Sequence, residues 1–104
     1  MGEDGHVASL FPKHPALEIY GSRYVEVENA PKLPPDRISV SLDLAKEIPD
    51  PFVFFIGEAK QTAYERFLRG DESPWAFPVM ALVREDAVIV TDRKKRETEI
   101  LRFS

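Results

Sequence analysis

The 104-residue chain contains no cysteine, which excludes disulfide bonds, thiolate nucleophiles and zinc–thiolate centres together. No apolar run approaches the ~18 residues that a membrane-spanning helix needs. The N-terminus also lacks the basic and then apolar segments of a signal peptide. Together these absences predict a cytoplasmic protein that is not associated with a membrane.

Signatures of phosphate-binding and metal-binding sites are also missing. Neither a Walker-type loop nor a GxGxxG motif occurs in the chain. The two histidines, His6 and His14, are eight positions apart, which matches no ligand spacing that a rigid element would impose. Both are therefore interpreted as incidental surface residues. We expect no metal and no cofactor, and the sequence identifies no catalytic residue.

The composition is that of a folded domain, because 43% of the residues are hydrophobic and 31% are charged. A formal net charge of −4 disfavours indiscriminate binding to nucleic acids but leaves a local basic patch open. Residues 1–16 show no periodicity and carry two glycines and two prolines, which predicts an N-terminal arm with freedom to move. Residues 17–104 are predicted to form a single α+β domain.

The strongest apolar signal lies between residues 78 and 103. The runs 79–83 and 87–90 are apolar at every position, which is typical of central strands with both faces buried. Residues 37–44 alternate apolar and polar side chains, which predicts a strand with one buried face. Gly21 and Ser22 predict a hairpin turn between two earlier strands. The predicted strands are 17–20, 23–28, 37–44, 51–56, 79–83, 87–90 and 97–103.

One helix is predicted, over residues 58–69. Glu58 places an acid in its first turn, and Arg66 and Arg69 place bases in its last, as the helix dipole favours. The sequence therefore predicts a mostly antiparallel, curved sheet or partly closed barrel of about seven strands, with this helix packed between strands four and five. An alternative for residues 52–83 is a crossover that joins two parallel strands.

Arg93, Lys94, Lys95 and Arg96 form the most conspicuous charged cluster. Four consecutive cations at a hairpin tip are a candidate contact for nucleic-acid phosphates. The competing interpretation is a solvated turn that guards a sheet edge against pairing with other chains. That interpretation is favoured because no aromatic side chain lies among the cations to stack on bases.

Three other residues are candidates for function. Lys60 lies within the apolar arc of the predicted helix, near the positive end of its dipole, and is therefore a candidate perturbed lysine. The favoured interpretation is that its side chain extends past the sheet edge into water. Trp75 and Phe77 lie between two prolines and are candidate partner-binding residues, although a plug that closes the end of the core is favoured.

These features favour a non-enzymatic protein-interaction module that binds a protein partner or itself as a homodimer. The reason is that many strands and a single helix leave an apolar face to be covered. Two alternatives stay open: a nucleic-acid-binding protein that uses residues 93–96, and a small enzyme with a site beside the 58–69 helix. The sequence names neither the partner nor a substrate.

Overall fold

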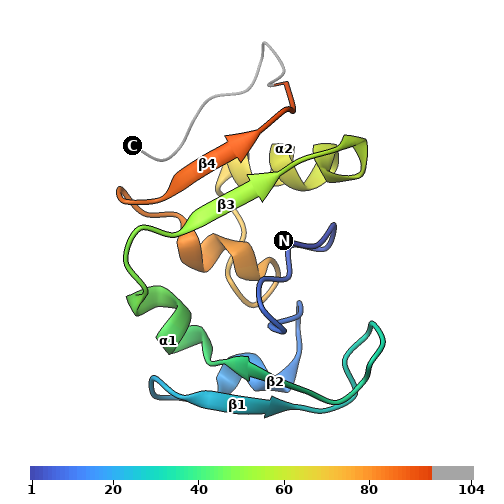
Figure 1. Ribbon diagram of the computed structural model, residues 1–104, viewed down its shortest axis with the longest axis vertical. Helices are drawn as coiled ribbons and strands as arrows, with labels where there is room; N and C mark the ends of the chain where they lie inside the picture. The colour runs from blue at the N-terminus through green and yellow to red at the C-terminus, as the bar shows by residue number, and fades with distance from the viewer. Residues whose placement is uncertain (95–104) are drawn as a thin grey trace.

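The computed structural model describes residues 1–94 of the chain. Within this range the strands form two separate two-stranded sheets, which lie at opposite ends of an elongated molecule (Figure 1). Strands β1 (Tyr24–Val27) and β2 (Arg37–Val40) are antiparallel, whereas β3 (Phe52–Phe55) and β4 (Val88–Thr91) are parallel. The helices are α1 (Leu42–Glu47), α2 (Gln61–Arg69) and the 3₁₀ helices η1 (Pro15–Glu18), η2 (Glu58–Lys60) and η3 (Pro78–Leu82). None of these helices is long and apolar enough to cross a membrane.

The predicted curved sheet or barrel of seven strands is wrong, because each observed sheet has only two strands. Residues 79–83, predicted as a central strand, lie largely in η3, where Pro78 stands in the first turn. Val79 and Ala81 are buried. A short apolar run does not distinguish a buried strand from a buried helical segment, and here the proline favours the helix.

The predicted hairpin around Gly21 is also wrong. Residues 15–18 form η1 in place of a strand, and β1 pairs with β2 across the proline-rich connector 29–36. Arg37 stabilises this connector, because its guanidinium donates hydrogen bonds of 2.9 to 3.0 Å to three connector carbonyls. The acceptors belong to Lys32, Leu33 and Pro34.

The helix predicted at 58–69 is confirmed, as η2 followed by α2. Its apolar side packs against β3, whose Val53 and Phe55 are buried, and Phe55 contacts Phe67 with ring centroids 5.0 Å apart. The connection after β3 does join two parallel strands, but the partner is β4 and not residues 79–83. Residues 95–104, which include the predicted strand 97–103 and part of the basic turn, lie outside the described residues.

The N-terminal segment passes between the two sheets (Figure 1) and contacts both halves of the molecule. Leu10 and Phe11 are fully buried in two different apolar clusters. The backbone of Gly5 accepts a hydrogen bond of 2.9 Å from the N–H of Val79, and the N–H of Ser9 donates to the hydroxyl of Ser39. This segment is therefore packed along its length, although its independent motion as an arm is untested.

Ser41 ends β2 and begins α1, which is why the predicted strand over 37–44 stops at Val40. Its fully buried hydroxyl accepts hydrogen bonds from the N–H groups of Leu44 and Arg23 and donates one to the carbonyl of Gly21. The bond from Leu44 is a helix N-cap, and the other two connect α1 to the segment before β1.

We expect Ser41→Ala to lower the free energy of unfolding by about 1–2 kcal/mol, because it removes the cap and leaves buried polar groups unpaired. Chemical denaturation followed by circular dichroism measures the change. Ser22→Ala, at an exposed serine of the neighbouring turn, is the control. Equal stability of the two variants would show that the Ser41 hydroxyl contributes nothing.

Candidate active site

Residues 2–6 form a tight loop that is closed by its own backbone. The N–H of Gly2 donates to the carbonyl of His6 at 2.9 Å, and the N–H of Gly5 donates to the carbonyl of Gly2 at 3.0 Å. Gly5 has a φ of +84°, a conformation that residues with a side chain rarely adopt. A Cβ atom at Gly2 would lie 2.1 Å from the ring of His6, so only glycine fits there.

The loop brings Asp4 and His6 together. The Oδ1 atom of Asp4 lies 2.7 Å from Nδ1 of His6 and also accepts the backbone N–H of His6 at 3.0 Å. Because an ionised carboxylate only accepts hydrogen bonds, Nδ1 carries the proton and Nε2 is the acceptor in the neutral ring. Within residues 1–94 no hydrogen bond of the structure engages Nε2. This nitrogen is therefore able to accept a proton from a bound molecule.

The charge of Asp4 is maintained by its contacts. Partial burial by itself would raise the pKa of the Asp4 carboxyl, but the hydrogen bonds from the backbone and ring of His6, with the nearby charge of Lys32, hold that pKa below its ordinary value. The carboxylate is thus ionised at neutral pH and accepts both hydrogen bonds from His6. An aspartate that orients a histidine in this way is the arrangement of general acid–base sites.

His6 lies at the edge of a hollow of about 300 Å³. Its ring packs against Phe11, with centroids 4.6 Å apart, and the guanidinium of Arg37 lies over the Phe11 ring at 5.1 Å. The other residues that line the hollow have apolar side chains and come from the N-terminal segment, β3 and η3. The residues that line it are Met1, His6, Val7, Ala8, Phe52, Val53, Phe54 and Leu82.

Lys60 lies near the same hollow, at the end of η2 and half-buried. Burial lowers the pKa of the Met1 amine, and the charge of Lys60 lowers it further, so the two amines lie within electrostatic reach of each other. Met1 itself lines the hollow. No ion pair or hydrogen bond of the described residues engages the Lys60 amine, which leaves this cation able to bind an anion.

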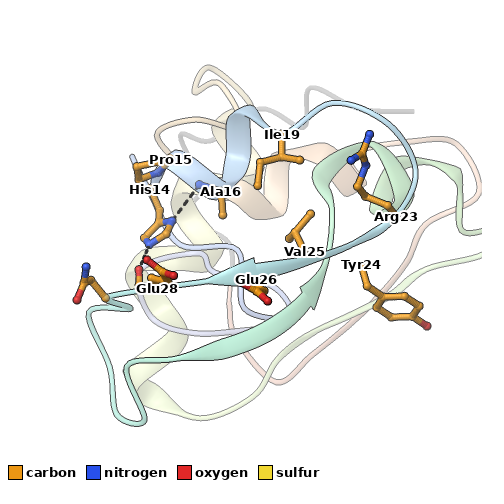
Figure 2. Close-up of a pocket in the computed structure, with 10 residues that line it drawn as sticks. His14, Pro15, Ala16, Ile19, Arg23, Tyr24, Val25, Glu26 and Glu28 are labelled. Carbon is orange, nitrogen blue, oxygen red and sulfur yellow. Dashed lines mark hydrogen bonds between the residues drawn. The ribbon is translucent and has the colours of Figure 1, made fainter.

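A larger hollow of about 780 Å³ lies between η1 and β1, and Figure 2 shows the residues around it. It contains the second histidine, His14. The Nδ1 atom of His14 accepts the N–H of Ala16 at 3.0 Å, and Nε2 lies 2.6 Å from the carbonyl of Glu28, to which it donates. Both ring nitrogens are therefore occupied by structural hydrogen bonds. The larger hollow therefore offers no free histidine nitrogen, whereas His6 offers one at the smaller hollow, so the smaller one is the better candidate site.

The other residues singled out from the sequence lie elsewhere. Phe77 is fully buried, whereas Trp75 is 40% exposed. Arg93 forms an ion pair of 2.8 Å with Asp92, and Lys94 is exposed. Lys95 and Arg96 lie outside the described residues. The expected contacts of Trp75 and Phe77 with a partner, and of the basic turn with nucleic acid, are untested, as is a homodimer.

Sequence reasoning missed His6, which was interpreted as an incidental surface histidine, and missed Asp4 with it. The available signal was the run Gly2-Glu3-Asp4-Gly5-His6, in which two glycines surround an aspartate two residues before a histidine. Such glycines permit a tight loop, and a tight loop can turn two side chains toward each other. Within the described residues no group of three or more potential ligands could hold a metal ion.

Comparison with known proteins identifies the family of the chain. Residues 1–91 match the family model of glucosamine-6-phosphate isomerases/6-phosphogluconolactonase. A probable 6-phosphogluconolactonase 2 of Oryza sativa subsp. indica is 32% identical over 94 residues, which are 86% of this chain and 34% of the relative. The 6-phosphogluconolactonase of Borreliella burgdorferi is 35% identical over 100 residues, covering 93% of this chain and 41% of the relative.

The chain thus spans about a third of the length of the curated relatives that it matches. The relatives are enzymes, and this finding overturns the prediction of a non-enzymatic interaction module. The sequence left enzymatic activity uncertain and leaned against it, whereas the family and the names of the relatives point to enzymes. The match over residues 1–91 shows that this chain belongs to the glucosamine-6-phosphate isomerase/6-phosphogluconolactonase family.

Proposed function

We propose that the chain carries the acid–base site of a 6-phosphogluconolactonase-type hydrolase, with His6 as the catalytic residue and Asp4 as its positioning residue. The observation that carries this proposal is the 2.7 Å contact between Asp4 Oδ1 and His6 Nδ1 beside the smaller hollow. The names of the relatives supply the substrate class, a lactone of a sugar phosphate.

The chemistry of lactone hydrolysis matches the available nitrogen of His6. Nε2 takes a proton from water while the water oxygen forms a bond to the lactone carbonyl carbon. The tetrahedral intermediate then breaks its bond to the ring oxygen, and the imidazolium returns the proton to that oxygen. One lactone and one water become one hydroxy acid. Asp4 keeps Nδ1 protonated throughout and stabilises the imidazolium between the two proton transfers.

The cations around the hollow suit a phosphorylated substrate. The guanidinium of Arg37 is committed to backbone carbonyls of the 29–36 connector, so its role is structural. Lys60 is the available cation near Met1 and therefore the proposed phosphate contact. The sequence singled out Lys60 as a candidate perturbed lysine. The role proposed for it here is that of an ammonium that binds the phosphate.

We expect His6→Gln to lower kcat for hydrolysis of 6-phosphogluconolactone by about 10²–10⁴-fold, the usual contribution of a general acid–base group. Release of the hydroxy acid, followed by NMR, measures the rate above the spontaneous background. His14→Gln is the matched control, because that histidine makes only structural hydrogen bonds. A His6→Gln protein as active as the parent, or a parent that does not accelerate hydrolysis, would refute the proposal.

Asp4→Asn should reverse the tautomer of His6. The asparagine amide can donate a hydrogen bond to Nδ1, so the ring proton moves to Nε2 and the acceptor is lost. We expect ¹⁵N NMR to show the Nδ1–H form in the parent and the Nε2–H form in the variant, with a fall in kcat. Glu3→Gln, which removes an exposed neighbouring carboxylate, is the control and should change neither the tautomer of His6 nor kcat. A parent with its proton on Nε2 would contradict the proposed role of Asp4.

Lys60→Met should raise KM for the phosphorylated lactone by about tenfold, which corresponds to the loss of one charge-assisted contact of ~1.5 kcal/mol. We expect kcat to change little, and KM for an unphosphorylated lactone to remain the same. Steady-state kinetics on the two substrates test this. Lys46→Met, at an exposed lysine of α1, is the control. An equal loss on both lactones would remove Lys60 from phosphate binding.

A further inference from the structure

We propose that Phe77, held in place by Arg66 and Glu72, is a positioning device for the Asp4–His6 pair. The three residues come from α2 and from the segment between α2 and η3, and none of them lines the hollow. The inference rests on the proposed function, since it assigns to these residues the alignment of the same histidine.

Phe77 contacts the loop at the residue that joins the two members of the pair. A Cβ atom at Gly5 would lie 2.2 Å from Cδ1 of Phe77, so the ring lies directly against the Gly5 backbone. The adjoining Val79 N–H donates to the Gly5 carbonyl at 2.9 Å. One short segment therefore supports Gly5 through a side chain and through the backbone. Displacement of the Phe77 ring would displace the link between Asp4 and His6.

Arg66 holds the Phe77 ring from another side. Its guanidinium carbon lies 4.0 Å from the ring centroid, in the geometry of a cation–π contact. A planar guanidinium stacked on a ring restrains the orientation of the ring, which a flexible ammonium does not. The hydrogen bonds that Arg66 donates to Glu72 are the main cause that raises the pKa of Arg66, and the charge of Asp4 also contributes, so the guanidinium lies within electrostatic reach of the pair.

Glu72 fixes Arg66 by a two-point contact. Nε of Arg66 donates to Oε2 at 2.7 Å, and the terminal nitrogen NH2 donates to Oε1 at 2.6 Å. Each side chain is only about a quarter exposed, at 26% for Arg66 and 25% for Glu72. A two-point contact between planar groups sets an orientation as well as a distance. The contacts thus run from Glu72 through Arg66 and Phe77 to Gly5, between the two residues of the site.

The pH dependence of this contact has a definite sign. The hydrogen bonds from Arg66 hold the pKa of Glu72 below its ordinary value, against a smaller effect of burial, and Arg69 adds to the lowering. A carboxyl with a lowered folded-state pKa stabilises the fold above its ordinary pKa and loses that contribution as pH falls through the lowered value. The contact is therefore complete at neutral pH, where the site would act.

The test uses Glu72→Gln and Arg66→Lys, because Phe77 belongs to the core and its replacement can unfold the chain. Arg66→Lys keeps the charge but loses the planar fork. We expect both variants to remain folded and to lower kcat by about tenfold, the effect of a small misalignment, with KM within a factor of two. Arg69→Lys, at the exposed arginine of the last turn of α2, is the matched control and should have the same kcat and KM as the parent.

A second readout separates this inference from the proposed function. The ¹⁵N shifts of the His6 ring report its contact with Asp4 whether or not the chain hydrolyses a lactone. We expect a mixture of tautomers in both variants and a single Nδ1–H form in the parent and in Arg69→Lys. Variants with a lower melting temperature but an unchanged His6 spectrum and kcat would show that the contact is only structural, and would overturn the positioning role.

The activity of the parent tests the proposed function, and the His6 spectrum tests the positioning role independently of it. A parent that does not hydrolyse the lactone refutes the proposed function, while a changed His6 spectrum in the two variants still supports positioning. Stability adds one check: the difference in unfolding free energy between the parent and Glu72→Gln should be present at neutral pH, should begin to fall below the ordinary pKa of a glutamate, and should be lost once the pH is below the lowered pKa of Glu72. A difference that persists in acid would place the effect outside the carboxylate contact.

Discussion

The structure depends on the burial of the N-terminal segment between the two sheets. Leu10 and Phe11 are fully buried there in separate clusters, and Gly5 lies against Phe77 with no room for a side chain. Within residues 1–94 each half of the molecule has a two-stranded sheet, and such a sheet is marginal without further packing. The segment supplies that packing to both halves. The same contacts hold the loop that carries Asp4 and His6.

The chemistry of the candidate site depends on which ring nitrogens of the two histidines are engaged in hydrogen bonds. His14 uses both in hydrogen bonds to the backbone, whereas His6 uses one with Asp4. The larger hollow beside His14 is therefore the weaker candidate for a catalytic site, although its volume is greater, because its histidine has no free ring nitrogen. The histidine of the smaller hollow, His6, has one. Membership of a family of sugar-phosphate enzymes agrees with this choice. The smaller hollow is preferred because of the 2.7 Å contact between Asp4 Oδ1 and His6 Nδ1, which a loop with two glycines makes possible.

The helix α2 connects the fold to the site. Its apolar side packs on β3, and its Arg66 contacts the ring of Phe77 next to the loop. The parallel pairing of β3 with β4 places the helix in the connection between them, as parallel strands require a long crossover. The strands themselves contribute Phe52 and Phe54 to the hollow. Core and candidate site thus share the same elements, so a change in either alters the other.

The sequence by itself determined the elements whose signals are local. It placed the 58–69 helix through its charge pattern, and it located much of the four strands through short apolar runs and through the alternation of apolar and polar residues over 37–44. Tertiary structure decided which strands pair, that residues 79–82 coil into η3, and that His6 faces Asp4. The physical reason is that periodicity records how much of a segment is buried but not which segment buries it. The role of His6 depends on a loop closed by long-range contacts to Phe77 and Val79, and these leave no periodic trace in the chain.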